Sequence, residues 1–189
     1  MKILFMAAIA VIGLSACNTN GNQSKENTAE AGDTALTQSG NSAIKSESSI
    51  SEVVTAYLQL KNALVNDNSK EAATAGGDLQ QAIEKTDTTS FSAEQQKVFS
   101  EVREDAKEHA EHIASNGSNI VHQREHFETL SQDLYDLVKV FPSSQTLYQT
   151  HCPMYNNNKG ANWLSETKEI KNPYLGTKML TCGEVKEEI

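Results

Sequence analysis

The sequence predicts a mainly α-helical fold, an antiparallel four-helix bundle followed by an irregular C-terminal cap with short β pieces. Apolar residues recur at helical spacing in four segments between about residues 49 and 141. Short polar turns separate these segments, which favours antiparallel neighbours in a bundle. After Pro142 the helical spacing stops, and Gly, Asn and Pro become frequent.

The first helix is expected from a capping box at residues 49–52 to about Asp67. Asn68 is suited to cap the second helix, in which the pair Gly76 and Gly77 lowers the intrinsic helix propensity. The apolar face of the first helix consists of Ile50, Val53, Val54, Tyr57, Leu58 and Leu64, and that of the second of Ala72, Ala75, Leu79, Ala82 and Ile83.

The third helix is expected to start with Ser-Ala-Glu-Gln at residues 92–95, and the fourth at Asn119. Pro142 cannot continue a helix and stops the fourth. The inward positions are Val98, Val102, Ala106, His109 and Ile113 in the third helix, and His122, His126, Leu130, Leu134, Leu137 and Phe141 in the fourth.

The cap carries β-prone pieces around residues 147–149 and 161–164. Turn-forming residues occupy 156–160 and 172–176, so one hairpin is expected here.

The N-terminus has the pattern of an export signal. Lys2 precedes an apolar run at residues 3–14 that is too short to span a bilayer, and Leu-Ser-Ala-Cys follows at 14–17. This pattern resembles a bacterial lipobox, which implies a signal peptide at 1–16 and acylation of Cys17. An ordinary secretory signal is the alternative. The lipobox places the protein on the periplasmic side of the cell envelope, anchored in the inner or the outer membrane.

Residues 17–47 are expected to form a flexible tether, because they include almost no large apolar side chain that could offset the entropy of ordering. The remaining residues, 48–189, suit one helical domain. The formal net charge of −9 disfavours nucleic acid as a partner.

The side chains suited to late transition metals are concentrated in the second half of the chain. Imidazole serves copper and zinc, and thiolate and thioether select soft Cu(I). Beyond Cys17, all His, Cys and Met residues lie between positions 109 and 182: His109, His112, His122, His126, His151, Cys152, Met154, Met179 and Cys182.

Hairpin geometry is expected to bring four of the histidines together. Residues 116–119 form the turn between the third and fourth helices, and His109 and His126 lie nearly equal distances on either side of it. His112 and His122 form a nearer pair. Equal distance from the turn means equal height along the bundle, so the four imidazoles should meet at one end. The alternative is a polar bundle end that binds no metal.

The cysteine count leaves one pair in the domain. If Cys17 is lipidated, Cys152 and Cys182 remain. They could form a disulfide in an oxidising compartment, or serve as metal ligands. Met154 and Met179 could equally fill the core.

Five stretches carry a resemblance to a known family: Glu-His-Ala-Glu-His at 108–112, His-Gln-Arg-Glu-His-Phe at 122–127, Cys-Pro-Met-Tyr at 152–155, Gly-Ala-Asn-Trp-Leu-Ser at 160–165, and Ile-Lys-Asn-Pro-Tyr at 170–174 followed by Gly176, Met179, Cys182 and Gly183. Over residues 50–186 the chain resembles a family of exported bacterial domains of unknown function, which also occurs as the C-terminal part of CusB-like heavy-metal efflux adaptors. The resemblance implies an association with the efflux of copper or related metals. It points to His109, His112, His122, His126, Cys152, Met154, Met179 and Cys182 as ligands, with His151 a secondary candidate.

We therefore expect a lipid-anchored protein that binds copper, or alternatively zinc, and buffers the ion or hands it to an efflux adaptor or pump. An enzyme is not expected. His-x-x-Glu-His at 122–126 fits an inverted zinc-protease motif, but additional His, Cys and Met ligands would close the open position that catalytic zinc keeps. The other alternative is a scaffolding lipoprotein stapled by a Cys152–Cys182 disulfide.

Overall fold

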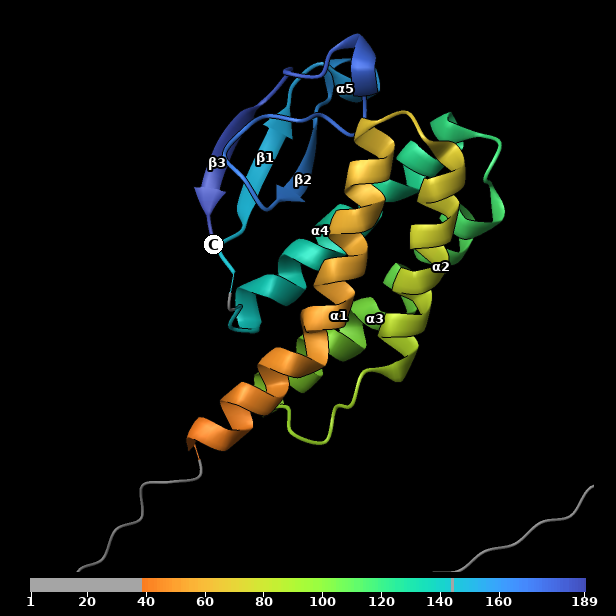
Figure 1. The fold of residues 1–189 in the computed structure, drawn as a ribbon. Coiled ribbons are helices and arrows are strands. Elements are labelled where there is room, and N and C mark those ends of the chain that lie inside the picture. The colour runs from red at the N-terminus through yellow and green to blue at the C-terminus, as the bar shows by residue number, and fades with distance from the viewer. Residues whose placement is uncertain (1–38, 144) are drawn as a thin grey trace, which may run out of the picture. The chain divides into compact units, whose positions relative to one another are not determined.

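The computed structural model describes residues 39–143 and 145–189. Four helices come first: α1 (Ser39–Val65), α2 (Ser69–Lys85), α3 (Ala93–Ser115) and α4 (Ile120–Val140). A small three-stranded antiparallel sheet follows them (Figure 1). The predicted mainly α fold with a β-containing cap is confirmed. Within the described residues, no helix combines the length and apolar character needed to cross a membrane.

The first helix begins earlier than the sequence predicted. α1 starts at Ser39 instead of Ser49, so residues 39–47, which we had assigned to the tether, are helical. No Gly or Pro lies between Asn41 and Val65, so nothing in this stretch interrupts the helix. The predicted signal peptide, Cys17 and the tether up to residue 38 lie outside the described residues.

The predicted caps of the other helices are confirmed. The Asn68 side chain accepts a hydrogen bond from the Glu71 amide, and the Asn119 side chain accepts one from the His122 amide. Ser92 and Gln95 form a reciprocal capping box at the start of α3. α4 ends at Val140, two residues before Pro142. These caps satisfy amide groups that a helix end would otherwise leave without partners.

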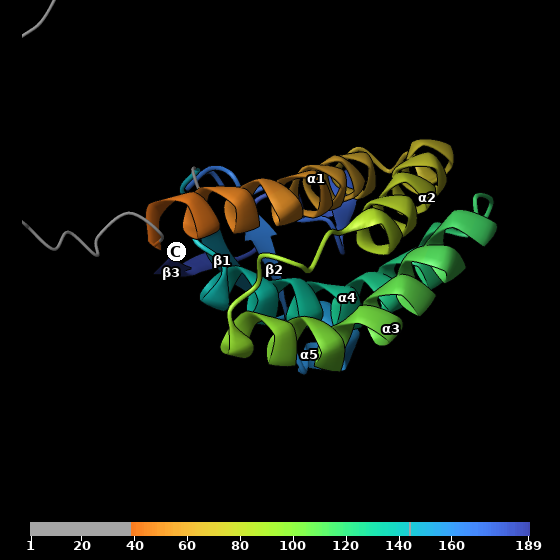
Figure 2. The same cartoon turned by 90° about the horizontal axis from the view of Figure 1, so that it is seen from below.

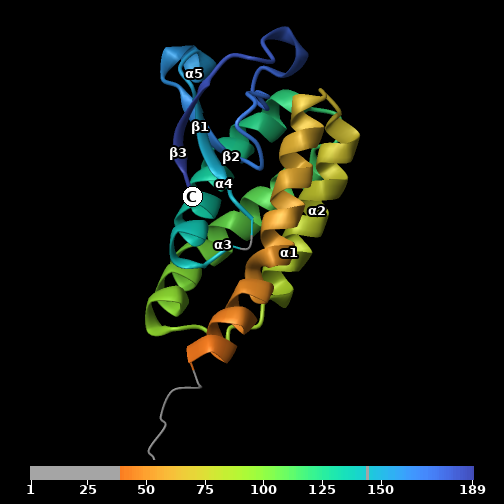
Figure 3. The ribbon, with the colours of Figure 1, turned by 60° about the vertical axis from the view of Figure 1, so that its left-hand side comes forward.

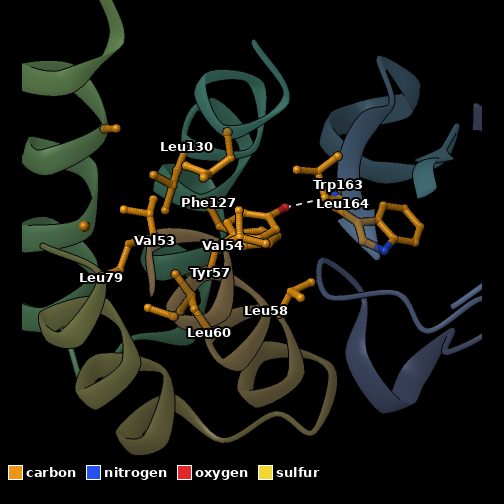
Figure 4. Packing of buried hydrophobic residues seen from close by; sticks show 14 of the residues in the cluster. Val53, Val54, Tyr57, Leu58, Leu60, Leu79, Phe127, Leu130, Trp163 and Leu164 are labelled. Atoms are coloured by element: carbon orange, nitrogen blue, oxygen red, sulfur yellow. Dashed lines mark hydrogen bonds between the residues drawn. The ribbon is translucent and has the colours of Figure 1, made fainter. Parts of the chain in front are cut away.

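The helices pack in two layers, with α1 and α2 in one layer and α3 and α4 in the other (Figure 2). Consecutive helices contact one another because short turns join them. Val53 and Tyr57 of α1 meet Leu79 of α2 and Phe127 and Leu130 of α4 in the core (Figure 4).

The sheet lies beside α4 (Figure 3). Strand β1 (Tyr148–Cys152) is central, between β2 (Ala161–Ser165) and β3 (Glu184–Glu188). The predicted hairpin joins β1 to β2 through the short turn α5 (Tyr155–Asn158), where three consecutive asparagines and Gly160 adopt positive φ angles. Asn and Gly tolerate this left-handed conformation best, so the hairpin turn follows directly from the sequence.

Strand β3 was not predicted. Its sequence, Glu-Val-Lys-Glu-Glu, is charged and largely exposed, and it occupies an edge of the sheet. Charged residues are typical of edge strands, where they discourage pairing with other chains. The pairing with β1, and not local strand propensity, makes this segment a strand. The 3₁₀ turn η1 (Gly176–Lys178) precedes it.

Two buried polar side chains attach the cap to the bundle. The Tyr57 hydroxyl shares a hydrogen bond with Ser131 and accepts one from the Leu164 amide of β2 (Figure 4). On α4, Arg124 donates to the carbonyl oxygens of Pro173 and Leu64. The cap therefore shares one core with α1 and α4.

The pair of glycines in α2 provides a matched test of this packing. A Cβ at Gly76 would lie 2.9 Å from Ile113 Cγ2 and 3.0 Å from the Ala110 carbonyl oxygen on α3, whereas a Cβ at Gly77 would meet only Ala114 Cβ at 3.9 Å. We expect Gly76→Ala to destabilise the protein by about 1–3 kcal/mol, because α2 and α3 would have to separate. Gly77→Ala should stabilise it by up to about 1 kcal/mol through helix propensity. Urea unfolding of both variants checks this prediction, and equal effects of the two changes would contradict it.

Candidate metal centre

Four histidines converge where α3 and α4 leave their common turn. His109 Nδ1 lies 2.8 Å from His126 Nδ1, and His126 Nε2 lies 3.1 Å from His122 Nε2. The ring of His112 stacks on that of His126, with centroids 4.5 Å apart. The predicted meeting of the four imidazoles is therefore confirmed, including the pairing of His109 with His126.

The histidines lie at the edge of the core and not within it. Gln123, Phe127 and Leu130 form the buried face of α4 near the turn, and His122 and His126 lie beside that face. The side chains of His109, His122 and His112 are 19%, 35% and 47% exposed. The prediction that His122 and His126 point into the core is wrong. The residues that follow them, Gln123 and Phe127, face the core, and the two histidines lie at its edge. Solvent and ions can therefore reach the cluster.

Three of the imidazoles lie close enough together to share one ion. One ring nitrogen from each of His112, His122 and His126 lies within 4.8 Å of the other two. Metal–nitrogen bonds of about 2.0–2.1 Å place adjacent ligand nitrogens about 2.8–3.4 Å apart in square or tetrahedral geometry. The 3.1 Å between His122 Nε2 and His126 Nε2 is within this range. The donor set therefore fits copper or zinc.

Carboxylates lie on the outer side of the imidazoles. Glu125 Oε2 is 3.2 Å from His122 Nδ1, and Asp105 Oδ1 is 3.5 Å from His109 Nε2. Histidines that bind metals commonly donate their second N–H to such a group, which fixes the ring orientation. His109 faces Nδ1 of His126, the nitrogen opposite Nε2. A series of side-chain contacts therefore runs from Asp105 through His109 to His126.

The charge state of His126 suits metal binding. Burial lowers the pKa of His126, and the neighbouring His112, His122 and His109 lower it further, while Glu125 opposes the shift. The imidazole is therefore neutral at neutral pH, and neutral imidazole is the form that coordinates a metal ion.

The candidate ligands of the cap lie elsewhere. His151 Nδ1 is 2.8 Å from the Asn162 side-chain oxygen, and Cys152 Sγ is 3.2 Å from Cys182 Sγ. Met154 and Met179 are 50% and 39% exposed, so they do not fill the core. Among the described residues, the group of His, Cys, Asp and Glu side chains close enough to share an ion contains no cysteine.

The expectation that the cap folds over the histidines is wrong. Arg124 stands between His122 and His126 in the sequence, and it hydrogen-bonds to Pro173 in the cap. Residues two apart in a helix point about 200° apart. The cap and the histidines therefore occupy different faces of α4. The contact between Arg124 and the cap, which the sequence does not show, is what determines this.

A buried carboxyl, Asp133, lies on the same helical face two turns after His126. The sequence analysis did not select Asp133, although a spacing of seven residues places it on the same face of the helix as His126. Among the described residues, its Oδ2 atom has no hydrogen-bond partner. Burial raises the pKa of Asp133 to about 7, and the carboxylates of Asp105 and Asp136 contribute.

This pKa predicts a pH-dependent effect of Asp133→Asn. A carboxyl whose pKa is raised on folding favours the folded state below its unfolded pKa of about 3.9, and this contribution is lost as the pH rises towards 7. Asn cannot ionise, so the variant should be more stable than wild type by about 1–3 kcal/mol at pH 8. The gain should shrink or vanish at pH 4. Urea titrations at the two pH values check this, and a pH-independent difference would contradict it.

Comparison with known proteins finds one family model that matches the helical part of the chain. No curated protein and no solved structure matches the chain. The match to the family model ends at residue 146, so it includes the four clustered histidines and stops before Cys152. The predicted resemblance to a domain family of unknown function is thus confirmed for the bundle: residues 53–146 match the family described as "Protein of unknown function (DUF3347)".

Proposed function

We propose that the protein binds a copper ion through His112, His122 and His126, with zinc as the alternative ion. The observation that carries the proposal is the approach of one nitrogen from each of these imidazoles to within 4.8 Å. An isolated histidine pair is a weak signal, but three imidazoles from two helices supply the donors of a metal site, and Glu125 gives His122 an outer hydrogen-bond partner.

The centre is suited to an exchangeable ion. Three protein ligands leave a fourth position open, whereas structural zinc sites are closed by four. His112 and His122 are partly exposed, so a donor from another molecule can enter that position. A site of this kind serves a protein that buffers the ion or hands it on.

The location of the protein completes the proposal. The lipobox at residues 14–17 would anchor the domain through Cys17 on the periplasmic side of the cell envelope. The resemblance to the C-terminal part of CusB-like adaptors implies a heavy-metal efflux adaptor or pump as the partner that receives the ion.

Two other functions receive less support. In the inverted zinc-protease motif, Glu125 would act as general base on a metal-bound water. Here its carboxylate lies at His122 Nδ1, the nitrogen turned away from the other histidines, which suits an outer hydrogen-bond partner. A purely scaffolding lipoprotein is supported only by the Cys152–Cys182 pair, and that pair is compatible with metal binding at the histidines.

Substitution of each ligand tests the centre. His112→Ala, His122→Ala and His126→Ala should each weaken Cu(II) or Zn(II) binding by more than the 10–100-fold typical of losing an outer partner. The matched control is His151→Ala, which removes an imidazole of the cap and should leave affinity unchanged. Competition titrations with a chelator of known affinity measure the constants.

Thermal melts give an independent check. Copper or zinc should raise the melting temperature of the wild-type protein, because an ion that binds the folded state stabilises it. The proposal is wrong if neither Cu(I), Cu(II) nor Zn(II) in excess raises the melting temperature, or if all three histidine variants bind metal as the wild type does.

The series of side-chain contacts from Asp105 to His126 predicts that changes at these outer residues weaken metal binding less than changes at the three ligands. His109→Ala and Asp105→Asn should weaken binding by roughly 10-fold, because His126 would lose the partner that orients its ring. Glu101→Gln is the control, since it removes one negative charge from α3 at a largely exposed site paired with Lys97. Equal losses for Asp105→Asn and Glu101→Gln would show that only overall charge matters.

A further inference from the structure

The two cysteines of the domain lie side by side in the cap. Cys152 ends β1 and is fully buried, and Cys182 precedes β3 and is half-buried. Their sulfur atoms are 3.2 Å apart, although 30 residues separate them in the sequence. We infer that Cys152 and Cys182 form a disulfide that locks the C-terminal segment onto the sheet.

Backbone pairing brings the two sulfurs together. In the antiparallel register of β1 and β3, His151 is opposite Glu184, so the chain reaches Cys182 two residues beyond the last pair. The Cys182 carbonyl accepts a hydrogen bond from the buried Asn172 side chain, and its amide donates to the Met179 carbonyl. Cys182 is therefore held beside Cys152 by bonds that do not involve either sulfur.

The geometry favours a disulfide over a metal site at these sulfurs. Two thiolates on one ion, each with a bond of about 2.3 Å, would be about 3.8–4.0 Å apart, farther than the observed 3.2 Å. Among the described residues, no third His, Asp or Glu donor joins the pair. Cys152 also belongs to the apolar core cluster.

The reaction needs a disulfide oxidant, such as oxidised glutathione or the disulfide of a thiol oxidase. The more exposed Cys182 reacts first: its thiolate attacks the oxidant, forms a mixed disulfide and releases one thiolate. The Cys152 sulfur, having lost its proton, then attacks Cys182 Sγ and releases the second thiolate. The two protons of the cysteines end on the two released thiols, and the two electrons reduce the oxidant.

The disulfide would stabilise the exposed edge of the sheet. β3 is an exposed edge strand whose neighbour in the sheet is β1, and closing the loop between residues 152 and 182 restricts the unfolded chain. The histidines lie on a different face of α4 from the cap. Oxidation should therefore leave the proposed metal centre unchanged.

Equilibration of the purified protein in a glutathione redox buffer tests the inference. After quenching with an alkylating reagent, peptide mapping should find Cys152 and Cys182 unmodified and joined, and both should become alkylated only after reduction. Reduction should lower the melting temperature of the wild-type protein. The double variant Cys152→Ser/Cys182→Ser should melt at the temperature of the reduced wild type, with or without reductant.

Free thiols or glutathione adducts at both positions in the oxidising buffer would overturn the inference, as would an unchanged melting temperature on reduction. Protection of both thiols by added Cu(I) or Zn(II) in that buffer would overturn it as well and assign the sulfurs to a metal. Metal affinity at the histidines, measured on the serine double variant, separates this result from the proposed function, since the two can fail independently.

Discussion

The buried guanidinium of Arg124 is the interaction on which the arrangement of the domain depends. It donates to the Leu64 carbonyl at the end of α1, to the Asp67 carboxylate in the following turn, and to the Pro173 carbonyl in the cap. A buried charge must be hydrogen-bonded, and removing one partner of such a pair typically costs about 3–5 kcal/mol. One side chain of α4 thus holds both the connection between α1 and α2 and the cap in position.

The same constraint determines where the histidines can lie. Arg124 directs one face of α4 to the cap. His122 and His126, each two positions from Arg124, lie towards α3, where their rings meet those of His109 and His112. α2 packs closely against α3 of this hairpin at Gly76. The candidate metal centre is therefore built on two rigid helices and not on loops, which favours ligands that keep their spacing without an ion.

The separation of imidazoles from sulfurs changes the chemistry expected of the protein. A mixed site of His, Cys and Met would have favoured Cu(I) strongly. A centre of three imidazoles serves Cu(II), Cu(I) and Zn(II), and an oxidised Cys152–Cys182 pair would offer no thiolate to compete with it. In the proposed function, the cap would contribute stability, and the ion would bind to the helical hairpin, which lies within the match to the domain family of unknown function.

The sequence by itself determined what depends on local spacing. The caps at Asn68, Ser92 and Asn119, the hairpin turn with its run of asparagines, and the height of His109 opposite His126 all follow from short-range rules, because helical rise and turn chemistry act within a few residues. Only the tertiary structure decided which face of α4 meets the cap, that the charged segment at 184–188 pairs as β3, and that Asp133 Oδ2 is buried with no hydrogen-bond partner among the described residues. These features depend on contacts between segments far apart in the chain, and no local pattern specifies such contacts.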